Sequence, residues 1–334
     1  MFFGIFLLLL ISPDFFSSII GIDKPIVIVA LVASLFAIFN ATFLTIIQLQ
    51  KKPVYWGIIT LIGLLLNIGV TFLLIFTLNL TYQARIVGIT VASLVQVLVG
   101  YYFITKNTLV HFRINKKHFM YFIKLGVPLI IVALSGWGLL SLDKILLQYF
   151  TNLQIVGFYV MASTLSSIIY QFINSITMAW TPFAYESLAK NVFQSLYNNS
   201  LIIFIFFILG SIILSTLGVY IFKFIIAEKF YISLNLIPII SAGIAISGLT
   251  SLLMPYILHA EDTKLLSLFT LISFLVAVGL NIILIKRMGM YGAALGTLAG
   301  HALRAIMMLL YVNKKFKVRI NILWIIYERF SHKL

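Results

Sequence analysis

The chain has 334 residues, of which 62% are hydrophobic and only 9% are charged. Soluble domains carry about 25% charged residues, so this chain has too few polar side chains to cover a water-facing surface, and a lipid bilayer is the solvent that fits it. Its formal net charge of +15 does not indicate nucleic-acid binding, because the cations lie in short breaks between apolar runs rather than on one face of a water-exposed domain.

Apolar runs separated by short polar breaks predict an all-α membrane protein with about ten transmembrane helices. The runs are continuous rather than alternating, which favours helices over a β-barrel. The expected spans lie near residues 1–20, 26–48, 54–78, 85–105, 120–142, 155–180, 198–226, 232–258, 264–286 and 290–312. Pro13 and Asp14 interrupt the first span. No cationic segment precedes that span, so we expect it to be retained rather than cleaved as a signal peptide.

The distribution of Lys and Arg predicts the orientation of these spans. Fifteen of these residues fall in one alternating set of breaks and seven in the other, with Arg304 inside the last span. The positive-inside rule places the richer set in the cytoplasm. We therefore expect both termini of this chain to be cytoplasmic. All the breaks are short, which indicates that the chain holds no soluble domain.

Two stretches of the chain follow one pattern. A span that ends in Leu66-Asn67 is followed by a span that Gly88 opens, and a span that contains Leu280-Asn281 is followed by one that Gly292 opens. We expect spans one to four to repeat as spans seven to ten, in the same orientation. Because two spans precede the second copy and none precedes the first, the pattern predicts a 6+6 architecture from which the first helix pair is missing.

This organisation divides the chain into four parts. Residues 1–110 are expected to form a partial N-terminal bundle of four spans, and residues 120–313 a six-helix C-terminal bundle. A cytoplasmic linker, 111–119, would join them, and a basic cytoplasmic tail, 314–334, would follow.

The middle of the chain carries motifs that resemble those of a known family. One span opens with Gly126-Val127-Pro128 and ends in Ser141-Leu142-Asp143-Lys144. The next opens with Val156-Gly157-Phe158-Tyr159 and ends in Ala179-Trp180-Thr181-Pro182-Phe183. In order and spacing, these motifs resemble helices seven and eight of the polysaccharide (Wzx-type, O-antigen) flippases. Those flippases belong to the multidrug/oligosaccharidyl-lipid/polysaccharide exporter superfamily.

This resemblance implies a V-shaped pair of six-helix bundles around a central cavity. It implies a flippase that moves undecaprenyl-diphosphate-linked oligosaccharide repeat units across the bacterial cell (cytoplasmic) membrane for biosynthesis of O-antigen, capsule or another surface polysaccharide. The expected partners are the lipid-linked oligosaccharide, membrane lipids and other membrane proteins of polysaccharide assembly. No nucleic-acid partner is expected.

Three alternatives to this function remain open. A drug or cation antiporter of the same superfamily would suit an acidic cavity, whereas the intramembrane charge here is mainly basic. A membrane polysaccharide polymerase would display large outer loops and an acid–base constellation. An inactive fragment is the third alternative, because two helices are expected to be missing.

The sequence carries no signature of an enzyme. The chain has no cysteine, H-E-x-x-H, phosphate-binding P-loop or G-x-S-x-G. His111 and His118 lie among basic residues, which disfavours a metal site, and Glu261 and Asp262 adjoin in a loop instead of facing each other. We therefore expect no catalytic residue, no cofactor and no metal. Transport would draw on an ion gradient, the membrane potential or substrate gradients.

Arg304 is the sharpest candidate for a substrate site. It lies within a span, where an isolated charge is costly and tends to face a cavity. His301 lies three residues earlier on the same helical face. Together they could contact the diphosphate or a coupling carboxylate. The alternative is that Arg304 snorkels to the cytoplasmic headgroups, about two turns away.

Three further charged residues lie at the ends of the fifth span. Asp143 and Lys144, at its outer end, could form a gate or a charge relay between the bundles, or an anchor pair in interfacial water. Lys124, at its cytoplasmic end, could attract the diphosphate. Positive-inside anchoring explains Lys124 equally well.

Polar residues in the sixth span are candidates for a sugar site. Tyr170, Gln171 and Asn174 form a polar stripe in an otherwise apolar helix. We expect them to line the path of the oligosaccharide. Trp180, in the same span, could stack on a sugar or belong to an interfacial aromatic belt.

Other small and amide side chains are interpreted as packing residues. Asn67 and Asn281 occupy equivalent positions of the repeat, where interhelical amides usually serve hydrogen bonds between helices. Gly292, Gly296 and Gly300 form a small-xxx-small series. That series indicates close helix packing rather than phosphate binding.

Overall fold

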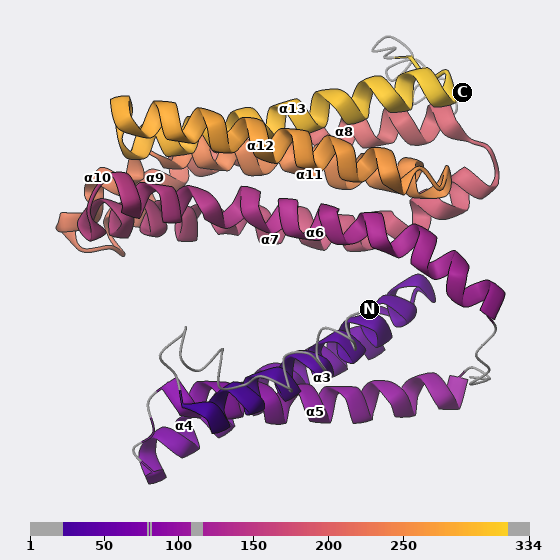
Figure 1. Ribbon diagram of the computed structural model, residues 1–334, viewed down its shortest axis with the longest axis horizontal. Helices are drawn as coiled ribbons and strands as arrows, with labels where there is room; N and C mark the ends of the chain where they lie inside the picture. Colours follow the sequence, from indigo (N-terminus) through magenta and orange to yellow (C-terminus); the bar gives the residue numbers. More distant parts are fainter. Residues whose placement is uncertain (1–22, 79, 81, 108–115, 320–334) are drawn as a thin grey trace, which may run out of the picture. The chain divides into compact units, whose positions relative to one another are not determined.

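The computed structural model describes residues 23–78, 80, 82–107 and 116–319, and all regular structure within these ranges is helical (Figure 1). Nine helices of this part are long and apolar enough to cross a membrane. They correspond to nine of the ten predicted spans, while the span predicted at 1–20 lies outside the described residues. The prediction of an all-α membrane protein is confirmed.

The chain divides into two compact units, Met1–Arg113 and Ile114–Leu334. The described helices of the first unit are α3 (Lys24–Leu49), α4 (Pro53–Leu78) and α5 (Tyr82–Asn107). The second unit contains α6 (Lys116–Phe150), α7 (Leu153–Ala189), α8 (Phe193–Ile213), a π-helical segment (Leu214–Gly218), α9 (Val219–Lys223), α10 (Tyr231–Leu234), α11 (Ile237–His259), α12 (Thr263–Met288) and α13 (Met290–Phe316).

Helices α6 and α7 are longer than predicted. The predicted spans end at 142 and 180, but the helices continue to Phe150 and Ala189. The 37 residues of α7 correspond to about 55 Å of α-helix, whereas the hydrocarbon core of a bilayer measures about 30 Å. The apolar pattern marks only the part that suits hydrocarbon, so it misses the additional turns. Helix α6 also begins at Lys116, inside the stretch expected to be a linker.

The turn between α12 and α13 requires a glycine. Gly289 adopts φ 54° and ψ −129°, a conformation that a residue with a Cβ atom rarely adopts. Its N–H donates to the carbonyl oxygen of Ile285 at 2.8 Å. The chain therefore reverses at a single residue, and α13 packs directly against α12.

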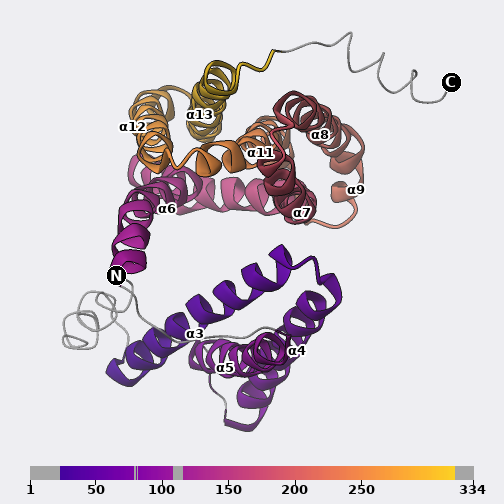
Figure 2. The ribbon, with the colours of Figure 1, turned by 90° about the vertical axis from the view of Figure 1, so that its right-hand side faces the viewer.

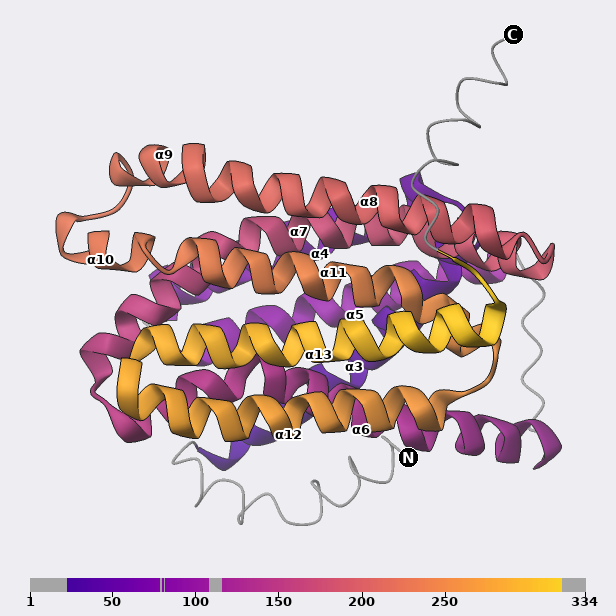
Figure 3. The same ribbon diagram turned by 90° about the horizontal axis from the view of Figure 1, so that it is seen from above.

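Six long helices form the second unit. Helices α8, α11, α13 and α12 lie side by side in that order (Figure 3). Helix α6 packs against α12, and α7 packs against α11 (Figure 2). Trp180 of α7 is 5% exposed, and its indole N–H donates to the carbonyl oxygen of Leu252 at 3.1 Å. This buried tryptophan fastens α7 to α11 and does not belong to an interfacial belt.

The expected copies of the repeat pack in the same way. Helix α5 packs against both α3 and α4, and α13 packs against both α11 and α12. A Cβ atom at Gly63 would overlap the side chain of Gln96, and one at Gly300 would lie 2.7 Å from the Cβ of Ala277. When the copies are aligned, Gly63 corresponds to Ala277 and Gln96 to Gly300. These two close helix contacts therefore fall at equivalent positions, which supports the repeat.

The acidic loop between α11 and α12 contacts two other helices, α6 and α13. Tyr121 of α6 donates its hydroxyl to Glu261 Oε1 at 2.6 Å. Tyr311 of α13 donates to Asp262, and Lys315 pairs with the same carboxylate at 3.4 Å. Both carboxylates thus hold helix ends together, in keeping with the interpretation that they are not a catalytic pair.

Candidate functional site

A cavity of about 230 Å³ lies within the second unit, between α6, α7, α11 and α13. Helix α11 gives it an apolar wall, while the other three helices contribute polar side chains. The polar lining residues are Asp143, Lys144, Tyr159, Ser163, Ser167, Tyr170, Thr297 and His301. Polar and ionisable groups inside a membrane bundle are costly and commonly mark a substrate or ion path. This cavity is therefore the candidate site.

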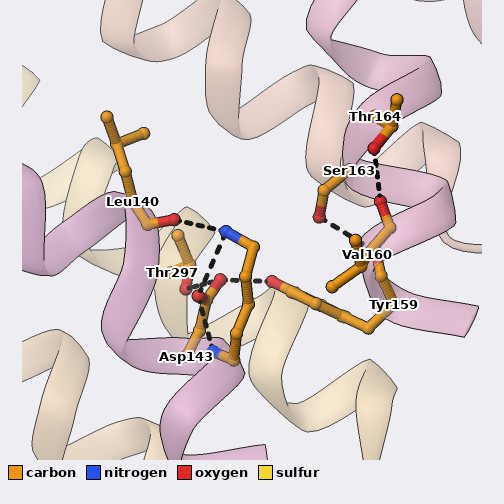
Figure 4. Close-up of polar contacts among 8 residues, drawn as sticks. Leu140, Asp143, Tyr159, Val160, Ser163, Thr164 and Thr297 are labelled. Atoms are coloured by element: carbon orange, nitrogen blue, oxygen red, sulfur yellow. Dashed lines mark hydrogen bonds and ion pairs between the residues drawn. The ribbon is translucent and has the colours of Figure 1, made fainter. Parts of the chain in front are cut away.

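Asp143 is the centre of the polar wall. The residue is 5% exposed, and its Oδ2 atom accepts hydrogen bonds from the hydroxyls of Tyr159 at 2.5 Å and Thr297 at 3.3 Å (Figure 4). Its Oδ1 atom accepts the backbone N–H of Lys144 at 2.8 Å and lies 3.8 Å from Lys144 Nζ. A carboxylate offers about four acceptor positions, and three are occupied here, while the ammonium group of Lys144 donates to the carbonyl oxygen of Leu140 at 2.5 Å. One side chain thereby joins α6, α7 and α13.

A stripe of hydroxyls on α7 forms the second part of the wall. Tyr159, Ser163, Ser167 and Tyr170 follow one another at intervals of four, four and three residues, which places them on one helical face. Ser163 donates to the carbonyl oxygen of Tyr159 at 2.9 Å, and Ser167 donates to that of Thr164 at 2.6 Å. A hydroxyl has one hydrogen and two lone pairs. Both serines therefore present only acceptors to the cavity.

Helix α13 carries His301 and Arg304 in its membrane-spanning part. His301 is 4% exposed and lines the cavity, and its Nδ1 atom has no hydrogen-bond partner among the described residues. Arg304, one turn further along, does not line the cavity and donates from Nη2 to Thr250 Oγ1 at 2.7 Å. Within the described part of the chain, no carboxylate pairs with this guanidinium, and its Nε also lacks a partner.

The structure brings half of the predicted site residues together. Those that line the cavity are Asp143, Lys144, Tyr170 and His301. The others lie elsewhere: Arg304 bonds to α11, and Lys124, Gln171 and Asn174 are exposed on α6 and α7. Asp143 is buried, so it is not an anchor in interfacial water. Tyr170 belongs to the serine stripe of α7 rather than to a stripe with Gln171 and Asn174.

Four polar residues of the cavity are not among the predicted site residues. They are Tyr159, Ser163, Ser167 and Thr297. The spacing along α7 was a signal that could have found the first three, because hydroxyl residues at every third or fourth position share a face. The contact between Thr297 and Asp143 joins residues 154 positions apart. This contact depends on how α13 packs on α6, and no pattern within either helix indicates it.

One family model matches the chain. It is described as "Polysaccharide biosynthesis protein", and the match covers residues 1–187, more than half of the chain. No curated protein matches the chain.

Several solved structures share the fold. A MATE transporter in complex with MaL6 superposes with a TM-score of 0.79 at 15% identity, covering 94% of this chain and 76% of that chain. A mutant of the Vibrio cholerae MATE transporter VcmN gives a TM-score of 0.79 at 14% identity, covering 95% and 76%. A transporter of the MOP superfamily from Pyrococcus furiosus gives 0.74 at 14% identity, covering 93% and 74%. The chain is thus similar in fold to MATE transporters.

Proposed function

The chain belongs to the polysaccharide biosynthesis protein family, and on this premise we propose that it flips undecaprenyl-diphosphate-linked oligosaccharide repeat units across the bacterial cell membrane. The cargo would move from the inner to the outer leaflet and supply the synthesis of a surface polysaccharide such as O-antigen or capsule. Both termini of the chain would then be cytoplasmic, and the Asp143 end of α6 would face outward.

The physical problem that such a protein solves is the sugar headgroup. Each hydroxyl transferred from water to hydrocarbon without a hydrogen bond costs about 4–8 kcal/mol, so an oligosaccharide does not cross a bilayer core unaided. The polyprenyl tail is already soluble in lipid. A flippase therefore needs a polar site for the headgroup within a helix bundle and no polar path for the tail.

The observation that carries the proposal is the cavity between the apolar helices of the second unit, whose wall includes polar side chains. Its wall offers serine and tyrosine hydroxyls and the side chain of His301. Arg304 lies one turn further along α13, half-buried against Thr250 and without a carboxylate partner in the described ranges. A cation in a low-dielectric environment attracts anions strongly, which favours a diphosphate-bearing substrate.

A drug or cation antiporter is the second candidate, because the buried Asp143 is a carboxylate within the bundle. Its oxygens, however, accept hydrogen bonds from Tyr159, Thr297 and the backbone N–H of Lys144, and the ammonium group of Lys144 forms an ion pair with it at 3.8 Å. A cationic substrate would have to displace these donors. The uncompensated charge beside the cavity belongs to Arg304 instead.

The proposal is tested by complementation in a bacterium that lacks its own repeat-unit flippase, with surface polysaccharide as the readout. We expect the wild-type chain to restore the polymer and Arg304→Ala to lose it at equal membrane abundance. Lys314→Ala, which removes an exposed cation from the same helix, is the matched control and should restore the polymer. Failure of the wild-type chain in hosts with several different repeat units would contradict the proposal.

A further inference from the structure

The size of the cavity limits what it can hold. Its volume is about 230 Å³, below the roughly 300–1,000 Å³ of pockets that bury drug-sized ligands. It has room for one small group, such as a single sugar ring, and not for several rings together with a diphosphate. If the protein moves an oligosaccharide, only one part of that substrate occupies this cavity.

The two serines of the wall offer only acceptors to a ligand. Ser163 and Ser167 each use their only hydroxyl hydrogen on a carbonyl oxygen of α7. Their lone pairs remain available to a ligand. A partner for them must donate hydrogen bonds, as the hydroxyls of a sugar do.

Neither the diphosphate of the substrate nor a coupling metal ion suits this wall. A diphosphate carries acceptors only, so it would meet the lone pairs of both serines and the carboxylate of Asp143. A cation would find both oxygens of Asp143 engaged by Tyr159, Thr297 and Lys144 (Figure 4), and would have only neutral oxygens as ligands. The wall therefore favours a neutral ligand that donates hydrogen bonds.

His301 supplies a polar group that no neighbour uses. The residue is 4% exposed, lines the cavity and has an Nδ1 atom without a partner among the described residues. Leaving a buried polar atom unpaired is unfavourable, so a ligand that pairs with Nδ1 recovers this loss. Ile244 and Leu298 complete the wall with apolar surface, which suits the C–H faces of a sugar ring.

We propose that the cavity is a subsite for one neutral sugar ring of the transported oligosaccharide, read by Ser163, Ser167 and His301. This inference rests on the proposed function. It assigns the diphosphate to a place outside the cavity, and it makes the cavity a determinant of which oligosaccharide the protein accepts.

Gly243 of α11 leaves space in the cavity for the sugar ring, because it has no side chain. A Cβ atom there would lie 3.5 Å from Leu298 Cα and 3.7 Å from His301 Cδ2, which is ordinary van der Waals contact. Gly243→Ala should therefore fold while it adds a methyl group between two lining residues. The subsite predicts that this variant weakens sugar binding although every polar group remains.

The direct test is saturation-transfer NMR on the purified chain in lipid nanodiscs, prepared free of glycoside detergents because their headgroups would compete. The probes are glucose, galactose, N-acetylglucosamine and N-acetylgalactosamine, each added alone. We expect at least one probe to bind the wild-type chain. We expect Ser167→Ala and His301→Leu each to weaken it about fivefold, since each removes one hydrogen bond.

Ser175→Ala is the matched control. Ser175 is exposed on the same helix and donates to a carbonyl oxygen of its own helix, as Ser167 does. Binding that is unchanged in Ser175→Ala and weakened in Ser167→Ala, His301→Leu and Gly243→Ala would support the subsite. Equal weakening in the control, or equal binding in all four variants, would overturn it.

Complementation separates the subsite from the proposed function. A wild-type chain that restores surface polysaccharide but binds none of the probes would overturn the subsite and leave the flippase intact. Binding of Na⁺ that Ser167→Ala abolishes, without binding of any sugar, would also overturn it, because the cavity would then hold a cation. Failure of both complementation and sugar binding would contradict both proposals.

Discussion

Helices α5 and α13 occupy equivalent places in two copies of one packing arrangement, yet they carry different side chains. Each packs between two other helices of its copy. At the positions where α13 has Thr297, His301 and Arg304, α5 has Ser93, Val97 and Gly100. Ser93 bonds to a carbonyl oxygen of its own helix, and Gly100 packs against the ring of Phe43. The small-residue contacts belong to both copies, whereas of these two helices only α13 contributes side chains to the polar site.

The contrast teaches that packing and function are separable in this fold. In the first copy the glycine, Gly63, lies on α4 and faces Gln96 of α5. In the second copy the glycine, Gly300, lies on α13 and faces Ala277 of α12, so the smaller residue has changed sides. The helices can therefore stay close while individual side chains change. A charged or hydroxyl-bearing residue can then be added where a cavity already exists.

The largest expected effect concerns a shared packing position. A Cβ atom at Gly292 would lie 2.2 Å from the carbonyl oxygen of Leu284, and backbone cannot move aside. Gly292→Ala should destabilise the protein by about 3 kcal/mol. At the equivalent Gly88 the nearest atom is the hydroxyl of Thr71, which can rotate, so Gly88→Ala should cost about 1–2 kcal/mol.

These two variants are compared by thermal unfolding of the purified protein. Gly279→Ala is the control, because a Cβ atom there meets nothing within 4 Å, and it should unfold as the wild type does. Equal losses of stability in Gly292→Ala and Gly88→Ala would contradict this prediction, because a clash with backbone would then cost no more than a clash with a side chain.

An intermediate effect is expected at the Asp143 centre. Tyr159→Phe removes a hydroxyl that donates to a buried carboxylate, and hydrogen bonds to charged groups contribute about 1.5–3 kcal/mol. In the first unit, Asn40→Ala removes a neutral amide bond to Gln96, for which about 1 kcal/mol is expected. Chemical unfolding of both variants measures the free energy of unfolding that each one loses. A greater loss for Asn40→Ala than for Tyr159→Phe would contradict the assignment of Asp143 as the centre of the polar wall.

The smallest effect compares two equivalent hydroxyls. Thr297→Val removes a bond to Asp143 at 3.3 Å from a second helix and should cost about 1 kcal/mol. Ser93→Ala removes a bond within its own helix and should change stability by no more than about 0.5 kcal/mol. Unfolding midpoints that shift equally would show that the α6–α13 bond adds nothing beyond a local one.

Most of the fold could be predicted because a helix that crosses a bilayer needs a long apolar stretch, and such stretches are visible in the sequence. The nine described spans appear in the sequence as continuous apolar runs, and Asn67, Gly88, Asn281 and Gly292 revealed the repeat. The ends of α6 and α7 could not be predicted, since helical turns outside hydrocarbon need no apolar pattern. The comparison with known proteins supports the family on residues 1–187.

The site was harder to predict because it depends on contacts between distant segments. Asp143, Lys144, Tyr170 and His301 were recognised as unusual residues for a span, and they do line one cavity. Arg304 was expected to share a site with His301, but one helical turn separates them in depth and Thr250 of α11 holds the guanidinium. That partner lies 54 residues away, and spacing on α13 alone could not indicate it.

The central claim is that this chain moves a carrier-linked oligosaccharide through a polar site in its second unit. The most direct measurement reconstitutes the chain in liposomes with a fluorescent undecaprenyl-diphosphate oligosaccharide and follows its transfer between leaflets with a membrane-impermeant quencher. We expect faster transfer with the wild-type chain than in empty liposomes. Arg304→Ala should lower the transfer rate at least about tenfold, and Lys314→Ala should leave it at the wild-type value. Transfer that is equally slow with the wild-type chain and in empty liposomes would contradict the central claim.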